Sequence, residues 1–297
     1  MIKNRHASAK PVRHPLTALL LVGLSACSPL QTFNAFLPKD GGARQIARDI
    51  VFGSQPRQAL DLYAPTRSDA GPRPGLPIIV FIYGGSWQSG DKNGYSFVGR
   101  ALASRGFLVA IPNYRLVPQV RYPAFLQDNA AAVRWLIANA ARHGGDPDRI
   151  VIVGHSAGAY NGSMLALDPR WLGGEWRAVR GFVGLAGPYD FLPLDGPVTK
   201  AAFGQEPQLA TTQPIQFASR DDPPTLLLHG AKDTTVFPRN SEKLRDRLTS
   251  AGVDARIRIY PELGHISILT TIARPFRGKA PVLDDVAKFA TEVSRPR

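Results

Sequence analysis

The sequence predicts an α/β fold in which a mostly parallel central sheet is flanked by helices and carries a short cap insertion. Short apolar runs rich in β-branched residues alternate with longer stretches of helical pattern, and this alternation is typical of parallel sheets that helices cover on both faces. The 297 residues are 44% hydrophobic and 20% charged, which favours one large domain over two small ones.

The first 26 residues have the pattern of a secretory signal peptide. Four basic residues precede a short apolar run at 16–24, and such a run is too short to span a bilayer permanently. It leads into Leu-Ser-Ala-Cys, in which Cys27 is the only cysteine of the chain. Because an unpaired cysteine is rarely left free in a secreted protein, we expect Cys27 to be modified.

The Leu-Ser-Ala-Cys segment resembles the lipobox of bacterial lipoproteins. The resemblance implies that Cys27 is alkylated with diacylglycerol and becomes the new N-terminus, and that Ser28 after it directs sorting to the outer membrane, as in enterobacterial lipoproteins. A plain signal peptidase site beside an incidental cysteine is the alternative. We expect a protein of the bacterial cell envelope that is lipid-anchored in the membrane and faces the periplasm.

The charge of the chain is consistent with that location. Its 36 basic and 23 acidic residues give a formal net charge of +13, which favours an anionic membrane or envelope surface. The basic residues are scattered, and neither a zinc-ligand spacing nor a nucleic-acid-binding motif is present. We therefore expect no nucleic-acid partner and no metal.

The folded domain is expected to extend from 46 to 297, after a tether at 27–45. Strands at 46–52 and 60–63 are expected to form an antiparallel hairpin. The further apolar runs, each expected to be a strand, lie at 77–83, 107–111, 150–153, 181–185, 224–228 and 256–260. Helical patterns separate most of them, at 94–104, 123–142, 157–167, 239–251 and 282–293. The stretch 190–219 has no strand and no strong helix pattern, so we expect it to be the cap.

A serine lies between two glycines where the strand at 150–153 turns into a helix. The segment Gly-His-Ser-Ala-Gly, with Ser156 at its centre, is the G-x-S-x-G pattern of a nucleophile elbow. Such a tight turn strains the serine and requires small residues two positions away, because larger side chains would collide. A glycine-rich connection in which the serine only caps the helix is the alternative.

A serine nucleophile needs a general base, which should lie in a loop at the carboxyl end of a strand. Of the six histidines, two belong to the signal peptide and one ends an exposed helix. His155 is adjacent to the serine, where neighbouring side chains diverge, and His229 ends a strand, where a packed histidine is the common outcome. His265, in the loop after the last expected strand, is therefore the candidate base.

The base needs an acid that holds its tautomer. Asp233 directly follows the strand at 224–228, and Asp190 follows the strand before it. We favour Asp233, because it gives the chain order Ser, Asp, His with the acid one strand before the base. The Gly-Gly pair after the strand at 77–83 lets backbone N–H groups approach a ligand, and each such donor can stabilise an oxyanion by about 3 kcal/mol.

Together these residues resemble the α/β-hydrolases, within the carboxylesterase group that includes BD-FAE esterases, hormone-sensitive-lipase-like esterases and kynurenine formamidases. The resemblance covers about 46–293. It rests on the segments 60–65, 83–87, 113–118 and 154–158 and on the loops that carry Asp233 and His265. It implies an oxyanion hole made by the backbone N–H groups of Gly85, Ser86 and Ala157. The sequence departs from the family at Tyr83, where the family usually has a loop-supporting histidine.

The resemblance implies a serine carboxylesterase that forms an acyl-enzyme on a small-molecule ester and needs no cofactor. Aryl formamidase activity, or a non-catalytic hydrolase-like binding protein of the envelope, are the alternatives. The cap offers Phe191, Phe203 and Phe217 as its large apolar groups, which is little surface for a long acyl chain. We therefore expect short acyl esters of about two to six carbons, including aryl or sugar acetyl esters, with Trp87 or Tyr160 as a stacking surface.

Overall fold

The computed structural model describes residues 29–66 and 75–296 of the chain. The expected signal peptide, Cys27 and Ser28 lie outside the described residues. Within the described ranges, no helix has the length and apolar character needed to cross a membrane.

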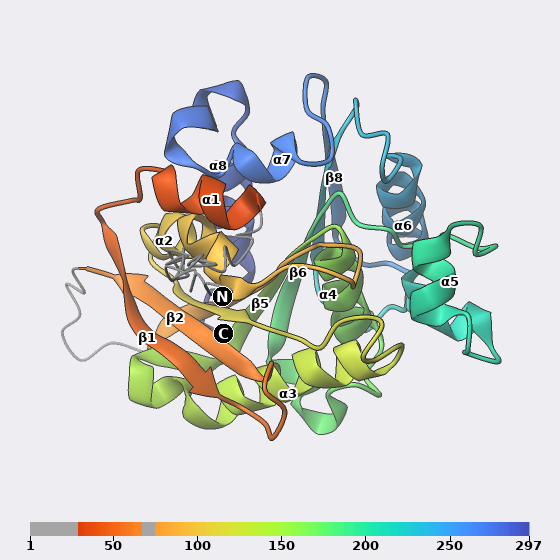
Figure 1. Cartoon of the computed structure of the whole chain (residues 1–297), viewed down its shortest axis with the longest axis horizontal. Coiled ribbons are helices and arrows are strands. Elements are labelled where there is room, and N and C mark those ends of the chain that lie inside the picture. The colour runs from red at the N-terminus through yellow and green to blue at the C-terminus, as the bar shows by residue number, and fades with distance from the viewer. Residues whose placement is uncertain (1–28, 67–74, 297) are drawn as a thin grey trace, which may run out of the picture.

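The described residues form an eight-stranded sheet with the order β1-β2-β4-β3-β5-β6-β7-β8 (Figure 1). Antiparallel pairs join β1 to β2 and β2 to β4, whereas the other neighbours are parallel. This confirms the expected α/β fold with a mostly parallel sheet. The strands are β1 Ala43–Val51, β2 Ala59–Pro65, β3 Leu76–Ile82, β4 Leu108–Pro112, β5 Gly145–His155, β6 Val179–Leu185, β7 Thr225–Gly230 and β8 Ala255–Tyr260.

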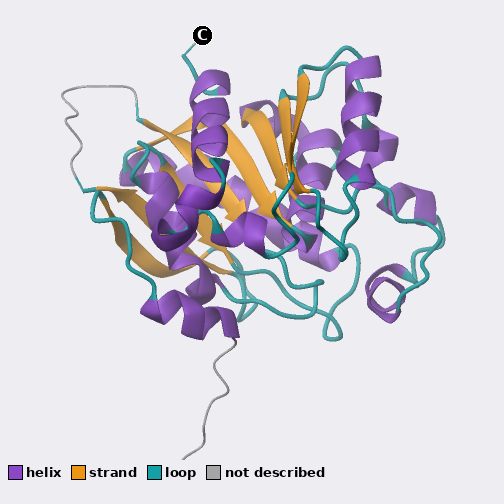
Figure 2. Cartoon of the chain, turned by 90° about the horizontal axis from the view of Figure 1, so that it is seen from above, coloured by secondary structure: helices purple, strands orange, loops and turns teal. Residues whose placement is uncertain are grey.

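Helices lie on both faces of the sheet (Figure 2). Helices α2 and α8 contact one face and each other, and α3, α4 and α6 cover the other face. The α-helices are α1 Pro29–Phe36, α2 Ser96–Ala103, α3 Ala124–Asn139, α4 Ala157–Leu167, α5 Pro197–Phe203, α6 Arg239–Ser250, α7 Ser267–Thr270 and α8 Val282–Val293. Short 3-10 turns precede α2 at Lys92–Tyr95 and follow α3 at Ala140–His143.

The central strands are buried on both faces, which explains why their sequences are continuous apolar runs. The side chains from Ile78 to Ile82 in β3 and from Ile150 to Val153 in β5 are fully buried. The order in which strands are added to the sheet reverses between β3 and β5. The chain goes from β3 to its neighbour β4 on one side, and from β5 to its neighbour β6 on the other. Ligands of open α/β sheets bind at the carboxyl ends of the strands at such a switch point.

We expected 27–45 to be a tether that does not pack on the domain. For the residues of this range that the structure describes, this expectation is wrong. Helix α1 packs beside α2 (Figure 1), where the ring of Phe33 meets that of Phe97 edge-on at 5.8 Å. The Asn34 Oδ1 accepts the backbone N–H of Phe97, in the first turn of α2, at 3.1 Å. These contacts join the segment to the domain, and they depend on residues about 60 positions later in the chain.

The stretch at 190–219, the expected cap, lies between β6 and β7 in the chain. It contains helix α5 and two short 3-10 turns, Leu209–Thr212 and Pro214–Phe217. Helix α5 begins at Pro197, and proline is favoured in a first helical turn. The stretch, expected to have no strand and no strong helix, has no strand and one α-helix of seven residues.

Candidate active site

Ser156 lies on the turn between β5 and α4 in a strained backbone conformation. Its φ and ψ are 55° and −125°, a region that costs about 1–3 kcal/mol for a residue with a side chain. The glycines on either side are required by packing. A Cβ on Gly154 would lie 2.3 Å from the carbonyl oxygen of Gly158, and one on Gly158 would lie 2.0 Å from that of Ile82. The spacing of the two glycines is thus explained by contacts within the turn and with β3.

The structure brings three of the expected site residues into one line of contacts. Ser156 Oγ lies 2.8 Å from His265 Nε2, and His265 Nδ1 lies 2.8 Å from Asp233 Oδ2. The Asp233 carboxylate only accepts, so the ring proton of neutral His265 is on Nδ1 and Nε2 is free to accept the serine proton. Ser156 is largely buried, with 8% of the residue exposed.

The Asp233 carboxylate is buried and held on both oxygens. Its Oδ1 accepts the backbone N–H groups of Thr235 and Val236, each at 2.9 Å. Its Oδ2 faces His265 at 2.8 Å and His229 Nε2 at 3.3 Å. Burial raises the pKa of Asp233, but the contacts with the two histidines and the N–H of Val236 outweigh it and hold the pKa well below its usual value. The carboxylate is therefore ionised at neutral pH.

Asp190, the alternative acid, lies elsewhere. Its carboxylate forms an ion pair with Lys243 Nζ at 2.7 Å, and both side chains are partly exposed. The structure therefore places Asp233, and not Asp190, against the candidate base.

His155 supports the loop of His265, a role that its position beside the serine did not indicate. The two rings lie 5.1 Å apart, and His155 Nε2 is 2.9 Å from the backbone carbonyl oxygen of His265. Burial, with a smaller contribution from the neighbouring His265, lowers the pKa of His155 to about 3. His155 is thus neutral, and its Nε2–H donates to the carbonyl.

The loop after β3 carries the expected oxyanion-binding groups. Gly85, Ser86 and Trp87 have consecutive positive φ angles of 122°, 56° and 58°, which is strained for the two residues that have side chains. Within the described part of the chain, the backbone N–H groups of Gly85, Ser86 and Ala157 donate no hydrogen bond. Gly84 lies directly against the elbow, since a Cβ there would be 2.8 Å from Ser156 Cβ.

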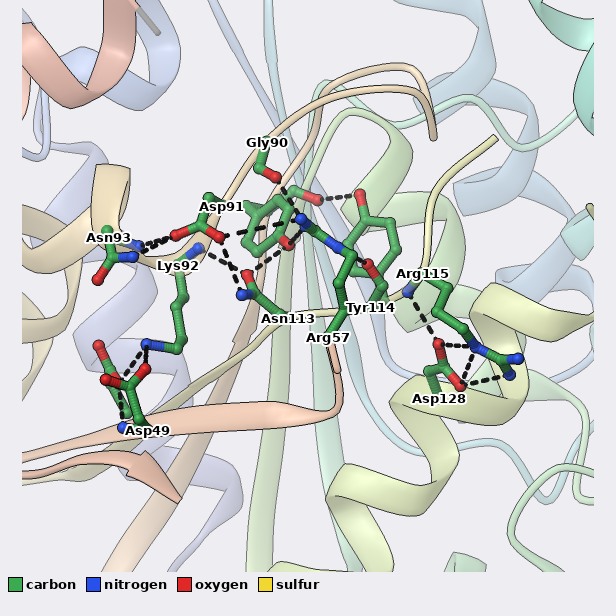
Figure 3. Close-up of polar contacts among 12 residues, drawn as sticks. Asp49, Arg57, Gly90, Asp91, Lys92, Asn93, Asn113, Tyr114, Arg115 and Asp128 are labelled. Atoms are coloured by element: carbon green, nitrogen blue, oxygen red, sulfur yellow. Dashed lines mark hydrogen bonds and ion pairs between the residues drawn. The ribbon is translucent and has the colours of Figure 1, made fainter. Parts of the chain in front are cut away.

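A polar network behind this loop joins its two ends (Figure 3). Arg57 Nη2 donates to the Tyr83 hydroxyl at 2.9 Å and to the carbonyl oxygen of Gly90 at 2.8 Å. The Tyr83 hydroxyl donates to Asn113 Oδ1 at 2.7 Å, and the Tyr114 hydroxyl donates to the Tyr83 carbonyl at 3.0 Å. Burial raises the pKa of Tyr83 well above its usual value, so the hydroxyl keeps its proton. Tyr83 therefore connects the loop to its surroundings at the position where the family usually has histidine.

Arg57 was not identified from the sequence, because it precedes the segments that carry the family resemblance. It comes from the connection between β1 and β2, and its Nε also donates to the Tyr114 carbonyl at 2.7 Å. Its neighbour across the network is Asp91, whose carboxylate accepts from Asn113 Nδ2 at 3.0 Å.

The aromatic residues beside the loop pack ring to ring. Trp87 meets Phe203 of the cap at 4.9 Å and Tyr160 of α4 at 5.3 Å, both edge-on. Phe125 and Phe191 also contact Trp87. Trp87 is 3% exposed and Tyr160 is fully buried, so the expectation that either ring offers a free stacking surface is wrong. Phe191 and Phe203 of the cap pack against both rings.

The cap contributes two of its three phenylalanines to this cluster. Phe191 and Phe203 belong to it, whereas Phe217 lies under the guanidinium of Arg170 at 5.0 Å. Among the described residues, no group of three or more histidine, cysteine, aspartate or glutamate side chains is placed to hold a metal ion.

The BD-FAE family model matches residues 60–248. The isoprenylcysteine alpha-carbonyl methylesterase ICME of Arabidopsis thaliana is 31% identical, over 82% of this chain and 62% of its own length. Esterase LipC of Mycobacterium tuberculosis is 28% identical, over 84% of this chain and 66% of its own length. The chain spans about 60% of the length of the curated plant relatives that it matches.

Solved structures of esterases share the fold. An esterase B from Lactobacillus rhamnosis has a TM-score of 0.75 at 21% identity, over 89% of this chain and 92% of its own. A truncated carbohydrate esterase from gut microbiota has a TM-score of 0.72 at 24% identity, over 87% of this chain and 99% of its own. At these identities the likeness concerns the fold.

Proposed function

The chain belongs to the BD-FAE family and has the α/β-hydrolase fold, and on this basis we propose that it is a serine carboxylesterase. The proposal rests on the two contacts of the His265 ring, one with Ser156 Oγ and one with Asp233 Oδ2, each at 2.8 Å. Ser156 follows β5, Asp233 follows β7 and His265 follows β8, and beside Ser156 lie backbone N–H groups that have no acceptor among the described residues.

The chemistry follows from this arrangement. His265 Nε2 takes the proton of Ser156 as its Oγ attacks the ester carbonyl carbon. The negative charge that forms on the carbonyl oxygen is stabilised by the N–H groups of Gly85, Ser86 and Ala157. When the tetrahedral intermediate collapses, the carbon–oxygen bond to the alcohol breaks and His265 returns the proton to the leaving alcohol. Water then attacks the acyl-serine by the same route and releases the acid.

We propose that the acyl group is short. The aromatic cluster around Trp87 already fills the space between the oxyanion loop and the cap, and Phe203 within it is 1% exposed. A long chain would have to displace these rings, and each buried methylene repays only about 0.8 kcal/mol. Exposed Phe237 and Ile266, which are close in sequence to Asp233 and His265, favour an apolar group such as an aryl ring on the solvent side.

A panel of p-nitrophenyl esters with acyl chains from acetate to laurate tests this proposal, together with aryl formamides and acetylated sugars. We expect kcat/KM to be greatest at about two to six acyl carbons, and a phosphonate probe to label Ser156. The Ser156→Ala variant should lose about 10⁶-fold in kcat and all labelling. Rates that rise through laurate would contradict the short acyl pocket, faster formamide hydrolysis would favour a formamidase, and absence of labelling would favour a binding protein.

We also propose that the enzyme acts in the bacterial envelope, anchored by lipid on Cys27. The support is the signal-peptide pattern and the single cysteine at its end. A lone acyl chain anchors only marginally, whereas several chains on one N-terminus anchor stably.

A further inference from the structure

His229 is buried beside the candidate acid and takes part in no step of the proposed mechanism. It lies at the end of β7, and its residue is fully buried. Its Nε2 is 2.8 Å from the carbonyl oxygen of Val236 and 3.3 Å from Asp233 Oδ2. Its Nδ1 is 2.7 Å from the hydroxyl of Ser241 in α6.

These partners determine where the ring carries its proton. A backbone carbonyl can only accept, so the Nε2 beside Val236 carries the hydrogen. The Ser241 hydroxyl then donates to Nδ1, and both nitrogens are satisfied by a neutral ring. The same Nε2 lies 3.3 Å from Asp233 Oδ2, so its hydrogen places a positive partial charge near that oxygen.

Two histidines therefore meet the same carboxylate oxygen. Asp233 Oδ2 has His265 Nδ1 at 2.8 Å on one side and His229 Nε2 at 3.3 Å on the other, while Oδ1 is held by two backbone N–H groups.

Resting on the proposed esterase function, we propose that His229 is a positioning residue that holds Asp233 Oδ2 toward His265 and weakens the attraction of the carboxylate for a proton on that base. Without this second donor, we expect the acidic limb of the pH–rate profile to lie at higher pH. Of the described residues, His155 is a further ionisable group beside His265, neutral and 5.1 Å from it ring to ring, whereas Lys232 and Glu262 in the flanking loops are exposed and pair with each other.

A matched pair of variants separates this role from simple packing. Asparagine at 229 can place its oxygen where Nδ1 is, which keeps the Ser241 contact, but it lacks the donor toward Asp233. Glutamine is longer and can place an N–H where Nε2 is. We expect His229→Asn to lower kcat about tenfold with little change in KM, and to move the acidic limb of kcat/KM to higher pH by about half a unit. His229→Gln should recover most of both.

Ser241→Ala is the control for packing, because it removes the partner of Nδ1 without touching Asp233. It should lower Tm and leave the acidic limb where it is in the wild type. An acidic limb that is unchanged or moves to lower pH in His229→Asn, or an equal shift in Ser241→Ala, would overturn the inference. If the wild type is active and labelled at Ser156 while these results fail, only the role of His229 is wrong. If Ser156 is not labelled, the proposed function itself fails.

Discussion

Replacing Asp233 by asparagine turns one carboxylate oxygen into an NH2 group, and the surrounding contacts determine which one. Oδ1 accepts two buried backbone N–H groups, from Thr235 and Val236, at 2.9 Å each. The amide oxygen must take this place, since an NH2 group there would leave both N–H groups without an acceptor, at about 1–3 kcal/mol each. The NH2 group therefore faces His265 Nδ1, where the carboxylate oxygen lay at 2.8 Å.

This orientation forces the wrong tautomer on the base. His265 Nδ1 must then accept from the amide, so the ring proton moves to Nε2, which faces Ser156 Oγ at 2.8 Å. A protonated Nε2 cannot take the proton of the serine. The same change in a serine protease triad lowers kcat by about 10⁴, which corresponds to about 5 kcal/mol of transition-state stabilisation.

The assay is the initial rate of p-nitrophenyl butyrate hydrolysis, with Tm measured on the same samples. Asp190→Asn is the matched control, because its partner is Lys243 in a partly exposed ion pair of a kind worth about 0–1 kcal/mol. We expect Asp233→Asn to lose about 10⁴-fold in kcat with KM nearly unchanged, and Asp190→Asn to keep kcat within about twofold. More than about 1% residual kcat in Asp233→Asn, or the reverse ranking of the two variants, would refute the tautomer argument.

Four further predictions follow from other parts of the chain. Arg57→Ala should lower kcat about 10–100-fold with little effect on KM, and guanidinium in the buffer should restore part of it; an unchanged kcat would show that the oxyanion loop holds without Arg57. Gly158→Ala should not yield folded protein, because its Cβ would lie 2.0 Å from the last carbonyl oxygen of β3, whereas Gly174→Ala, with no atom within 4 Å of its Cβ, should keep the wild-type Tm. Burial raises the pKa of Asp222 to about 6. Its protonation therefore stabilises the folded state as the pH falls from about 6 toward the ordinary pKa of an aspartate, and Asp222→Asn should flatten the dependence of Tm on pH over that range. Cys27→Ala should move the mature protein from the membrane fraction to the soluble periplasm or block its processing, and wild-type protein without added mass at Cys27 would contradict the lipid anchor.

Much of the fold was predictable because its signals are local. Strands that are buried on both faces must be apolar along their whole length, so the runs that became β3 and β5 stood out in the sequence. The elbow was visible for a related reason, since the turn at Ser156 admits only glycine at 154 and 158.

The sequence alone also narrowed the histidines to His265, because only one of them follows a strand in a loop without another evident role. It favoured Asp233 over Asp190, because Asp233 lies one strand before the base. The contacts of the two carboxylates come only from the tertiary structure, which places Lys243 against Asp190 and His265 against Asp233.

What the sequence could not indicate depends on residues that are distant in the chain. Helix α1 packs because Phe33 meets Phe97, and the rings of Trp87 and Tyr160 are covered by a cap that begins thirty or more residues after them. Arg57 reaches the ends of a loop that starts 26 positions later. A pattern in the sequence reports what a residue needs from its near neighbours, whereas hydrogen bonds and ring contacts between separate elements form only when the sheet brings the ends of its strands together.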